Sequence, residues 1–224
     1  MKIRINKKFS KYLLPMHPVV LITTISKKSE DNAGVYATLI DISYNPPIVL
    51  FASNKFQHRM INNPIANTSP QDTYLNIKET KCFIVNVPSM SLINKLKIFA
   101  YPFPRGVDEI KIANLKKQKP FELTKNKIYP SIIKECLAHI ECSLLKIINI
   151  KQSDHFLIVG KVVAVSYDSK LGKDFNKVRT NLIKKVFGNL GAFSKNERLM
   201  GRINPFKVKC PVYITDKILF NKNK

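Results

Sequence analysis

The sequence predicts a mainly β fold, a small antiparallel barrel with α-helices at its edges. Short apolar runs rich in β-branched residues recur along the chain, and polar turns separate them. Segments with the apolar spacing of a helix are few and short. No internal repeat or low-complexity linker interrupts the 224 residues, so we expect a single domain over residues 1–224.

Three strands are predicted before residue 55. Residues 19–26 (VVLITTIS) form a β-branched run, and the polar turn KKSEDN leads from it into a second run over residues 33–40 (AGVYATLI). Pro46 and Pro47 exclude a helix directly before the third run, residues 48–53. This third run ends in small or polar residues, which a strand buried only for packing does not require.

A short helix and a fourth strand follow a long polar loop. Residues 72–80 (DTYLNIKET) predict the helix, with Asp72 or Thr73 at its N-cap. Residues 82–87 (CFIVNV) predict the strand, and residues 91–101 predict a second helix. One side of this second helix carries Leu92, Leu96 and Phe99.

The second half of the chain predicts a long hairpin and a shorter tail. Residues 135–150 form a strand, and KQSDH turns it into another strand over residues 156–168. A helix near residues 175–187 and a last strand over residues 212–219 complete the tail. The first hairpin strand alternates between an apolar face (Ala138, Ile140, Cys142, Leu144) and a second face (His139, Glu141, Ser143).

The charge of the chain favours anionic ligands over a specific nucleic-acid site. The formal net charge is +23, but only 6 of the 38 basic residues are Arg, and the basic residues are spread along the chain. Arg is the residue suited to bidentate recognition of phosphate. Long-range attraction of anions is therefore the more general consequence. A basic nucleic-acid-binding module stays an alternative.

Several classes of site have no support in the sequence. The four cysteines form no C-x-x-C pair and the four histidines no H-E-x-x-H motif, so we expect buried thiols and no metal site. No apolar run approaches the roughly 18 to 20 residues that span a bilayer. The basic N-terminal segment lacks a signal-peptide core, which predicts an unprocessed cytoplasmic protein. Glycine-rich nucleotide motifs are missing, so an enzyme of this sequence would rely on a bound cofactor.

A series of short motifs in a fixed order points to one family. In chain order they are HPVVLITT, NAGVYATLIDISYNPPIVLFASN, QDTYLNIKETKCFIVNV, PRGVDEIKIANL, ECSL and SDHFLIVGKVV. This series resembles the flavin reductase-like family, whose fold is the FMN-binding split barrel, an antiparallel Greek-key barrel. The resemblance covers residues 15–168 as the core, has a faint echo in FGNLGAF, and leaves residues 169–224 as a C-terminal extension.

The resemblance implies FMN as cofactor and assigns residues to its two ends. Backbone groups of the segment VYATL would lie along the isoalloxazine ring, and the end of the third strand with the start of the helix would hold the phosphate. Free N–H groups at a helix N-terminus suit a phosphate. The implied cofactor-binding residues are Tyr36, Ala37, Thr38, Ser53, Asn54, Lys55, Gln71, Asp72 and Thr73.

Some of these residues have alternative interpretations. Tyr36 is equally well explained as a core aromatic, and Thr73 as a helix cap alone. Asp72 would repel phosphate through its carboxylate, so we assign it to capping or to a backbone amide contact. Gln71 departs from the family, in which many members have Lys at this place. A replacement cation is expected from Lys55 or from the following loop, which contains His58 and Arg59.

The resemblance also implies activity and assembly. We expect an NAD(P)H-dependent oxidoreductase that reduces free flavin, ferric ion or another acceptor through bound FMN, and a homodimer with FMN near its interface. His155 stands where some reductases of the family have a histidine near the nicotinamide, although a solvated hairpin histidine explains it as well. The alternative is an FMN protein of the same fold that stores flavin or passes electrons to a partner protein.

Overall fold

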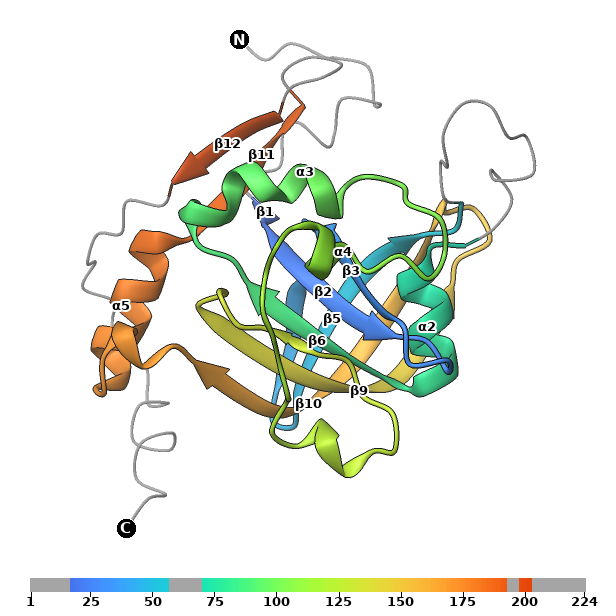
Figure 1. The fold of residues 1–224 in the computed structure, drawn as a ribbon, viewed down its shortest axis with the longest axis horizontal. Helices are drawn as coiled ribbons and strands as arrows, with labels where there is room; N and C mark the ends of the chain where they lie inside the picture. Colours follow the sequence, from blue (N-terminus) through green and yellow to red (C-terminus); the bar gives the residue numbers. More distant parts are fainter. Residues whose placement is uncertain (1–16, 57–69, 193–197, 203–224) are drawn as a thin grey trace, which may run out of the picture.

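The computed structural model describes residues 17–56, 70–192 and 198–202, and its centre is a curled antiparallel sheet. The seven strands are arranged in the order β3-β2-β6-β9-β10-β5-β4. Their bounds are β2 (Val20–Ile25), β3 (Asp31–Tyr36), β4 (Ile40–Tyr44), β5 (Pro47–Asn54), β6 (Cys82–Val87), β9 (Ala138–Asn149) and β10 (His155–Tyr167). The sheet curls so that β5 passes behind β2 in Figure 1. Since β3 and β4 end the sheet without pairing to each other, the predicted barrel is open along one side.

Short elements cover the edges of this sheet (Figure 1). Two small sheets join β1 (His17–Pro18), β11 (Phe187–Ala192) and β12 (Arg198–Arg202), and β7 (Lys117–Gln118) with β8 (Ile132–Ile133). The helices are α2 (Asp72–Thr80), α3 (Leu96–Phe99), α4 (Glu109–Ile112) and α5 (Phe175–Lys185), with 3-10 turns η3 (Met90–Lys95), η4 (Leu123–Lys125) and η5 (Ser169–Leu171). No helix in the described ranges is long and apolar enough to cross a membrane.

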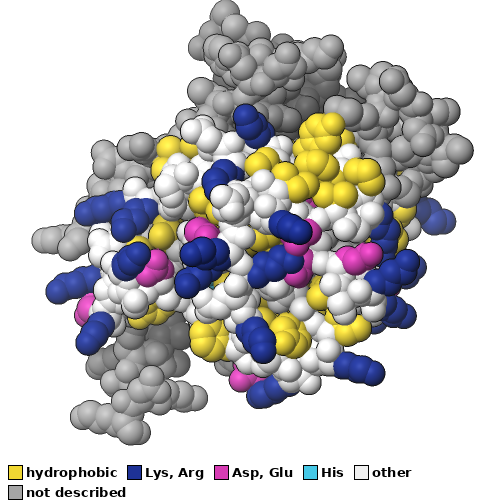
Figure 2. All heavy atoms as spheres, viewed as in Figure 1, with side chains coloured by type: hydrophobic (Ala, Val, Ile, Leu, Met, Phe, Trp, Pro, Cys, Tyr) yellow, Lys and Arg dark blue, Asp and Glu magenta, His cyan; other side chains and the backbone are white. Residues whose placement is uncertain are grey.

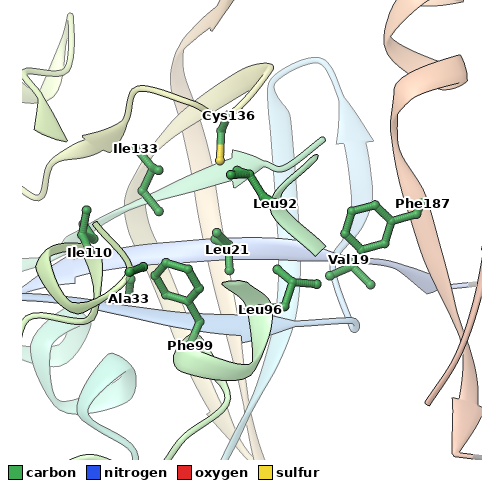
Figure 3. Close-up of a cluster of buried hydrophobic side chains, with 11 residues drawn as sticks. Val19, Leu21, Ala33, Leu92, Leu96, Phe99, Ile110, Ile133, Cys136 and Phe187 are labelled. Carbon is green, nitrogen blue, oxygen red and sulfur yellow. The ribbon is translucent and has the colours of Figure 1, made fainter. Parts of the chain in front are cut away.

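Strand β2 is buried on both faces, which agrees with its sequence of apolar residues and threonines without a charge. Val20 and Ile22 point into the barrel, where Phe51 and Phe83 meet edge to face with ring centroids 5.4 Å apart. A Cβ at Gly160 would lie 2.4 Å from Phe83 Cζ, so only glycine leaves room for this ring. The opposite face of β2 packs under α3. Figure 3 shows this second core, in which Val19, Leu21, Leu96, Phe99 and Ile110 converge from separate elements.

The prediction of one strand over residues 33–40 is wrong in its second half. Strand β3 ends at Tyr36, and β4 is a separate strand that the sequence analysis did not predict. Thr38 lies in the connection, where its Oγ1 accepts from Ala52 N at 3.0 Å and donates to Ala52 O at 3.2 Å. This double contact ties the connection to β5, so the chain turns where the residue pattern alone reads as one strand.

The helices also differ in detail from the predictions. The N-cap of α2 is Gln71, because Asp72 and Thr73 already belong to the first turn. The helix predicted over residues 91–101 is a 3-10 turn followed by one α-helical turn, although its three apolar residues are buried as expected. Helix α5 ends at Lys185, because Phe187 starts β11. The strand predicted over residues 212–219 lies outside the described residues.

The second face of β9 is buried at His139 and Glu141. Glu141 accepts the backbone N–H groups of Phe121, Glu122 and Leu123 at 2.6, 2.8 and 2.9 Å. His139 Nδ1 lies 3.0 Å from Asn86 Oδ1, and burial lowers the pKa of this imidazole to about 4. The neutral ring must carry its proton on Nδ1, since Asn86 Oδ1 can only accept. Both polar side chains therefore have hydrogen-bond partners, Glu141 in residues 121–123 and His139 in Asn86 of β6.

Candidate functional site

A cavity of about 480 Å³ opens between β3, the end of β5, the start of α2 and the segment after α3. Its volume falls within the range of roughly 300–1,000 Å³ that small-molecule sites occupy. Backbone and side chains of Asn32 to Tyr36 form one wall. Asn54, Gln71 and Thr73 line the cavity at the end of β5 and the start of α2, and Phe99 and Glu109 line it from α3 and α4.

Hydrogen-bond donors converge at the end formed by β5 and α2. The carbonyl oxygen Oε1 of Gln71 accepts from Ser53 Oγ at 2.9 Å, from Asn54 N at 3.1 Å and from Tyr36 Oη at 3.2 Å. Burial raises the pKa of Tyr36 to about 12, so its hydroxyl stays protonated and donates. Three donors from two strands, β5 and β3, thus surround one acceptor oxygen. A ring of donors of this kind can also receive an anionic oxygen.

The start of α2 adds the electrostatic character of a helix N-terminus. The first helical hydrogen bond runs from Leu75 N to Gln71 O, so the N–H groups before Leu75 have no partner within the helix ladder. Helix dipoles make this end favourable for negative charge. Gln71 itself makes no side-chain cap bond to the helix, since its carbonyl oxygen faces the donors from β3 and β5.

Thr73 is held so that its hydroxyl proton remains available to donate. Asn32 Nδ2 donates to Thr73 Oγ1 at 3.2 Å and to Thr24 Oγ1 at 3.2 Å. Asn76, one turn further along α2, donates to Thr24 Oγ1 at 3.1 Å as well. Because these amides only donate at Nδ2, Thr73 accepts from Asn32 and can donate its own O–H, for which Tyr36 is the neighbour in the cavity wall.

Arg105 clamps the outer side of α2. Its guanidinium lies 3.7 Å from Asp72 Oδ1 and 3.5 Å from Glu79 Oε2, and it donates to Asn76 Oδ1 at 3.3 Å. These three partners stand at helical spacing, so one side chain contacts successive turns of α2. Asp72 therefore has a cationic partner at the helix start.

Glu109 is the member of the site that the sequence analysis missed. It is the first residue of α4, it is 7% exposed, and its Oε2 accepts from Ala33 N in the cavity wall at 2.9 Å. Burial raises the pKa of this carboxyl to about 7, and the charges of Asp72 and Asp108 add to the effect. The motif GVDEIK contained the residue, but a lone Glu in a short helix gave no signal of burial.

Close packing against the backbone shapes the β3 wall. A Cβ at Gly34 would lie 3.0 Å from Tyr36 Cε2 and 3.4 Å from Thr73 Oγ1. Glycine at this position therefore leaves room for the Tyr36 ring and the Thr73 hydroxyl in the cavity wall.

Aromatic and apolar residues border the cavity after α3. Phe99 and Tyr101 line it, and Tyr101 packs on Phe103 with ring centroids 4.6 Å apart. Figure 2 shows hydrophobic side chains gathered in this part of the surface, while Lys and Arg side chains are scattered over the face with acidic ones among them.

The sequence-predicted residues divide into two groups. Tyr36, Asn54, Gln71, Asp72 and Thr73 line the cavity, and Ser53 joins them through Gln71. The other predicted residues are not part of its lining: Ala37, Thr38, Lys55 and His155.

Two of these residues, Lys55 and His155, lie at the β9–β10 hairpin. Lys55 Nζ donates to Ile150 O at 2.6 Å and lies 5.4 Å from the centroid of the Phe156 ring, so its charge points toward the hairpin. His155 starts β10 directly opposite Asn54 in the sheet register. Its Nδ1 lies 2.5 Å from Asp154 Oδ1, and that contact lowers the pKa of Asp154. The register thus places His155 at the same end of β5 as the ring of donors.

Comparison with known proteins gives consistent matches. Residues 15–182 match the family model described as flavin reductase like domain. An uncharacterized protein of Methanothermobacter thermautotrophicus is 29% identical over 153 residues, an alignment that spans 67% of this chain and 63% of that protein. Nitrilotriacetate monooxygenase component B from Bacillus cereus has a similar structure, with a TM-score of 0.74 at 18% identity, covering 93% of this chain and 99% of that chain. Flavoredoxin from Methanosarcina acetivorans follows with a TM-score of 0.69 at 17% identity, covering 98% and 100%.

Proposed function

The chain belongs to the flavin reductase-like family, and from that membership we propose that it binds FMN in the cavity and uses it to oxidise NAD(P)H. A bound flavin supplies the hydride-accepting chemistry that no side-chain motif of this sequence provides. The split-barrel fold expected from the sequence is the fold of the similar structures. The specific cofactor, reductant and acceptor are part of the proposal.

The observation that carries the proposal is the ring of donors around Gln71 Oε1. Ser53, Asn54 and Tyr36 donate to this one oxygen beside the N-terminus of α2, and Thr73 has a hydroxyl proton to donate. A phosphate monoester offers oxygens that accept several such bonds at once, and charge-assisted bonds are the stronger kind. Rotation of the Gln71 side chain would free three donors for a phosphate oxygen.

The remainder of the cavity suits a flat heteroaromatic ring. Gly34 of β3 lines the cavity, and so do the apolar residues Phe99 and Pro102. A flavin ring has an apolar body and a polar edge, so it needs both kinds of wall. In this proposal β3 positions the ring, the segment after α3 excludes water from it, and the β5–α2 end holds the phosphate.

His155 is proposed to position the dinucleotide instead of acting as an acid or a base. It lies opposite Asn54, at the end of β5 where the donors converge. Hydride transfer requires a closely placed nicotinamide more than it requires proton transfer.

We further propose that the protein is a homodimer that uses the β10-β5-β4 end of the sheet. Tyr44 is 85% exposed and Ile40 52% on β4, while Val165 is 70% exposed on β10. These large apolar side chains belong to neighbouring strands at one end of the sheet. An open sheet end with exposed apolar residues is the kind of surface that a second subunit covers.

Light scattering tests the assembly separately from the cofactor. The wild type is expected to have twice the mass of the chain at micromolar concentration, and Val165→Asp is expected to shift it toward the monomer. Lys27→Asp, at an exposed residue of the turn between β2 and β3 away from these strands, is the control and should keep the dimer. A wild type of monomer mass would refute the assembly.

The experiment that tests the function has two steps. The purified protein is first titrated with FMN, and the expected result is tight binding with quenched flavin fluorescence. NADH or NADPH is then added without oxygen, and loss of the oxidised-flavin absorbance is expected. Binding without reduction would favour the alternative, a flavin protein that stores FMN or passes electrons to a partner.

A further inference from the structure

Two carboxyl groups line the cavity that we propose for an anionic flavin. Asp72 comes from the first turn of α2, and Glu109 comes from the first turn of a separate helix, α4. A ligand with a doubly charged phosphate would enter a space that already contains these two acids. Like charges in one cavity oppose each other unless a cation or a proton neutralises them.

The two acids are neutralised in different ways. Asp72 lies beside the guanidinium of Arg105 at 3.7 Å. Among the residues that the structure describes, Glu109 forms no ion pair with Lys or Arg, and the hydrogen bonds to its carboxyl come from the backbone N–H groups of Ala33 and of Glu109 itself. Its carboxyl therefore depends on a proton for neutrality.

We propose that FMN binding is coupled to proton uptake at Glu109, which enters the flavin complex as the neutral acid. This inference rests on the proposed function, because it requires an anionic flavin in the cavity. Glu109 thus acts as a positioning residue: the neutral carboxyl keeps its contact with Ala33 and leaves the β3 wall without a charge. The ionised carboxyl would face both Asp72 and the ligand.

The surroundings of Glu109 determine the direction of the coupling. Asp72 faces it from α2, and Asp108, the N-cap of its own helix, is paired with Lys117 of β7. The neutral phenol of Tyr36 lies in the same cavity wall. Arg105 is engaged by Asp72, Asn76 and Glu79. The pKa of Glu109 is about 7 before any ligand is added. An anion in the cavity and the exclusion of water both raise that pKa further, so binding takes up protons near neutral pH.

The test measures FMN affinity as a function of pH in the wild type and in Glu109→Gln. Each unit by which FMN raises the pKa of Glu109 weakens binding about tenfold between pH values well below and well above 7. The Kd of the wild type is therefore expected to rise by about tenfold or more from pH 6 to pH 9. The variant should show a flatter curve and should bind FMN more tightly than the wild type at pH 9. Its amide oxygen can still accept from Ala33 N, so the fold is expected to be retained.

Two further comparisons remove trivial explanations. The second ionisation of the FMN phosphate, near pH 6, affects both proteins equally and cancels between them. Glu122→Gln makes the same charge change at an exposed residue paired with Lys125 and should follow the wild-type curve. Calorimetry in two buffers of different ionisation enthalpy should detect proton uptake near pH 7.5 in the wild type and less in Glu109→Gln.

The possible results separate this inference from the proposed function. Parallel pH curves for the wild type and Glu109→Gln, with equal proton uptake, would overturn the role of Glu109 while FMN binding stands. FMN binding that is missing at every pH in a folded wild type would refute the proposed function, and this inference with it.

Discussion

Removing two hydroxyl donors, Ser53→Ala and Thr73→Ala together, tests the position of the phosphate. Ser53 is fully buried and its Oγ lies 2.9 Å from Gln71 Oε1, at the focus of the donors. Thr73 accepts from Asn32 and has its proton left to donate. Each hydrogen bond to a charged group contributes about 1 to 2 kcal/mol, so the double variant should lose about 2 to 4 kcal/mol of FMN binding.

This loss corresponds to a roughly 30-fold to 1,000-fold rise in Kd. Fluorescence titrations with FMN and with riboflavin measure it, because riboflavin has the same ring and no phosphate. Riboflavin should bind the wild type and the double variant almost equally. Ser43→Ala removes a hydroxyl that donates to Pro46 O on exposed β4, and it should leave both affinities unchanged. An equal loss for both flavins, or no loss for FMN, would place the phosphate elsewhere.

Three other substitutions test separate parts of the structure. Glu141→Gln replaces a buried carboxylate, which accepts three backbone N–H groups, with an amide that cannot accept all three. Chemical denaturation should show that the free energy of unfolding falls by about 2 to 4 kcal/mol. A fall below about 0.5 kcal/mol would contradict the assigned hydrogen bonds. Glu109→Gln should gain stability relative to the wild type as the pH rises from 4.5 to 7. The pKa of Glu109 is higher in the native state than in the unfolded state, so the native wild type binds an extra proton in this window. The wild type therefore loses on the order of 3 kcal/mol of stability across the window, and the variant does not. An unchanged stability difference between pH 4 and pH 8 would show that the carboxyl is not buried in this way. His155→Ala should keep FMN bound and the dimer intact, and should slow flavin reduction mainly through a higher apparent KM for NAD(P)H; wild-type saturation in stopped-flow would leave His155 a solvated hairpin residue.

Most strands could be predicted because their residues combine local preference with burial. Residues 82–87 were predicted with the bounds that β6 has, and the two hairpin strands and α2 were placed within a few residues. β4 was missed because its side chains are largely exposed, so no apolar alternation distinguishes it from a loop. Its existence depends on pairing with β5, a contact that residue patterns do not report.

The candidate site was predictable where it is built from the ends of secondary-structure elements. The polar end of β5 and the start of α2 are visible in the sequence, and the structure brings Ser53, Asn54 and Gln71 into contact there. The hydrogen bond from Asn32 to Thr73 joins residues 41 positions apart, and the bond from Ala33 to Glu109 joins residues 76 apart. Such contacts depend on how α2 and α4 pack on the sheet, so single residues gave no signal for them.

The central claim is that this cavity holds an FMN that NAD(P)H can reduce. The most direct measurement is the visible absorbance of the FMN-loaded protein, followed without oxygen as NADH or NADPH is added. The account predicts loss of the oxidised-flavin band with one of the two reductants, and its return when oxygen is admitted. A folded protein that binds FMN but keeps the oxidised band with both reductants would contradict the reductase function, and one that binds no FMN would contradict the cavity assignment itself.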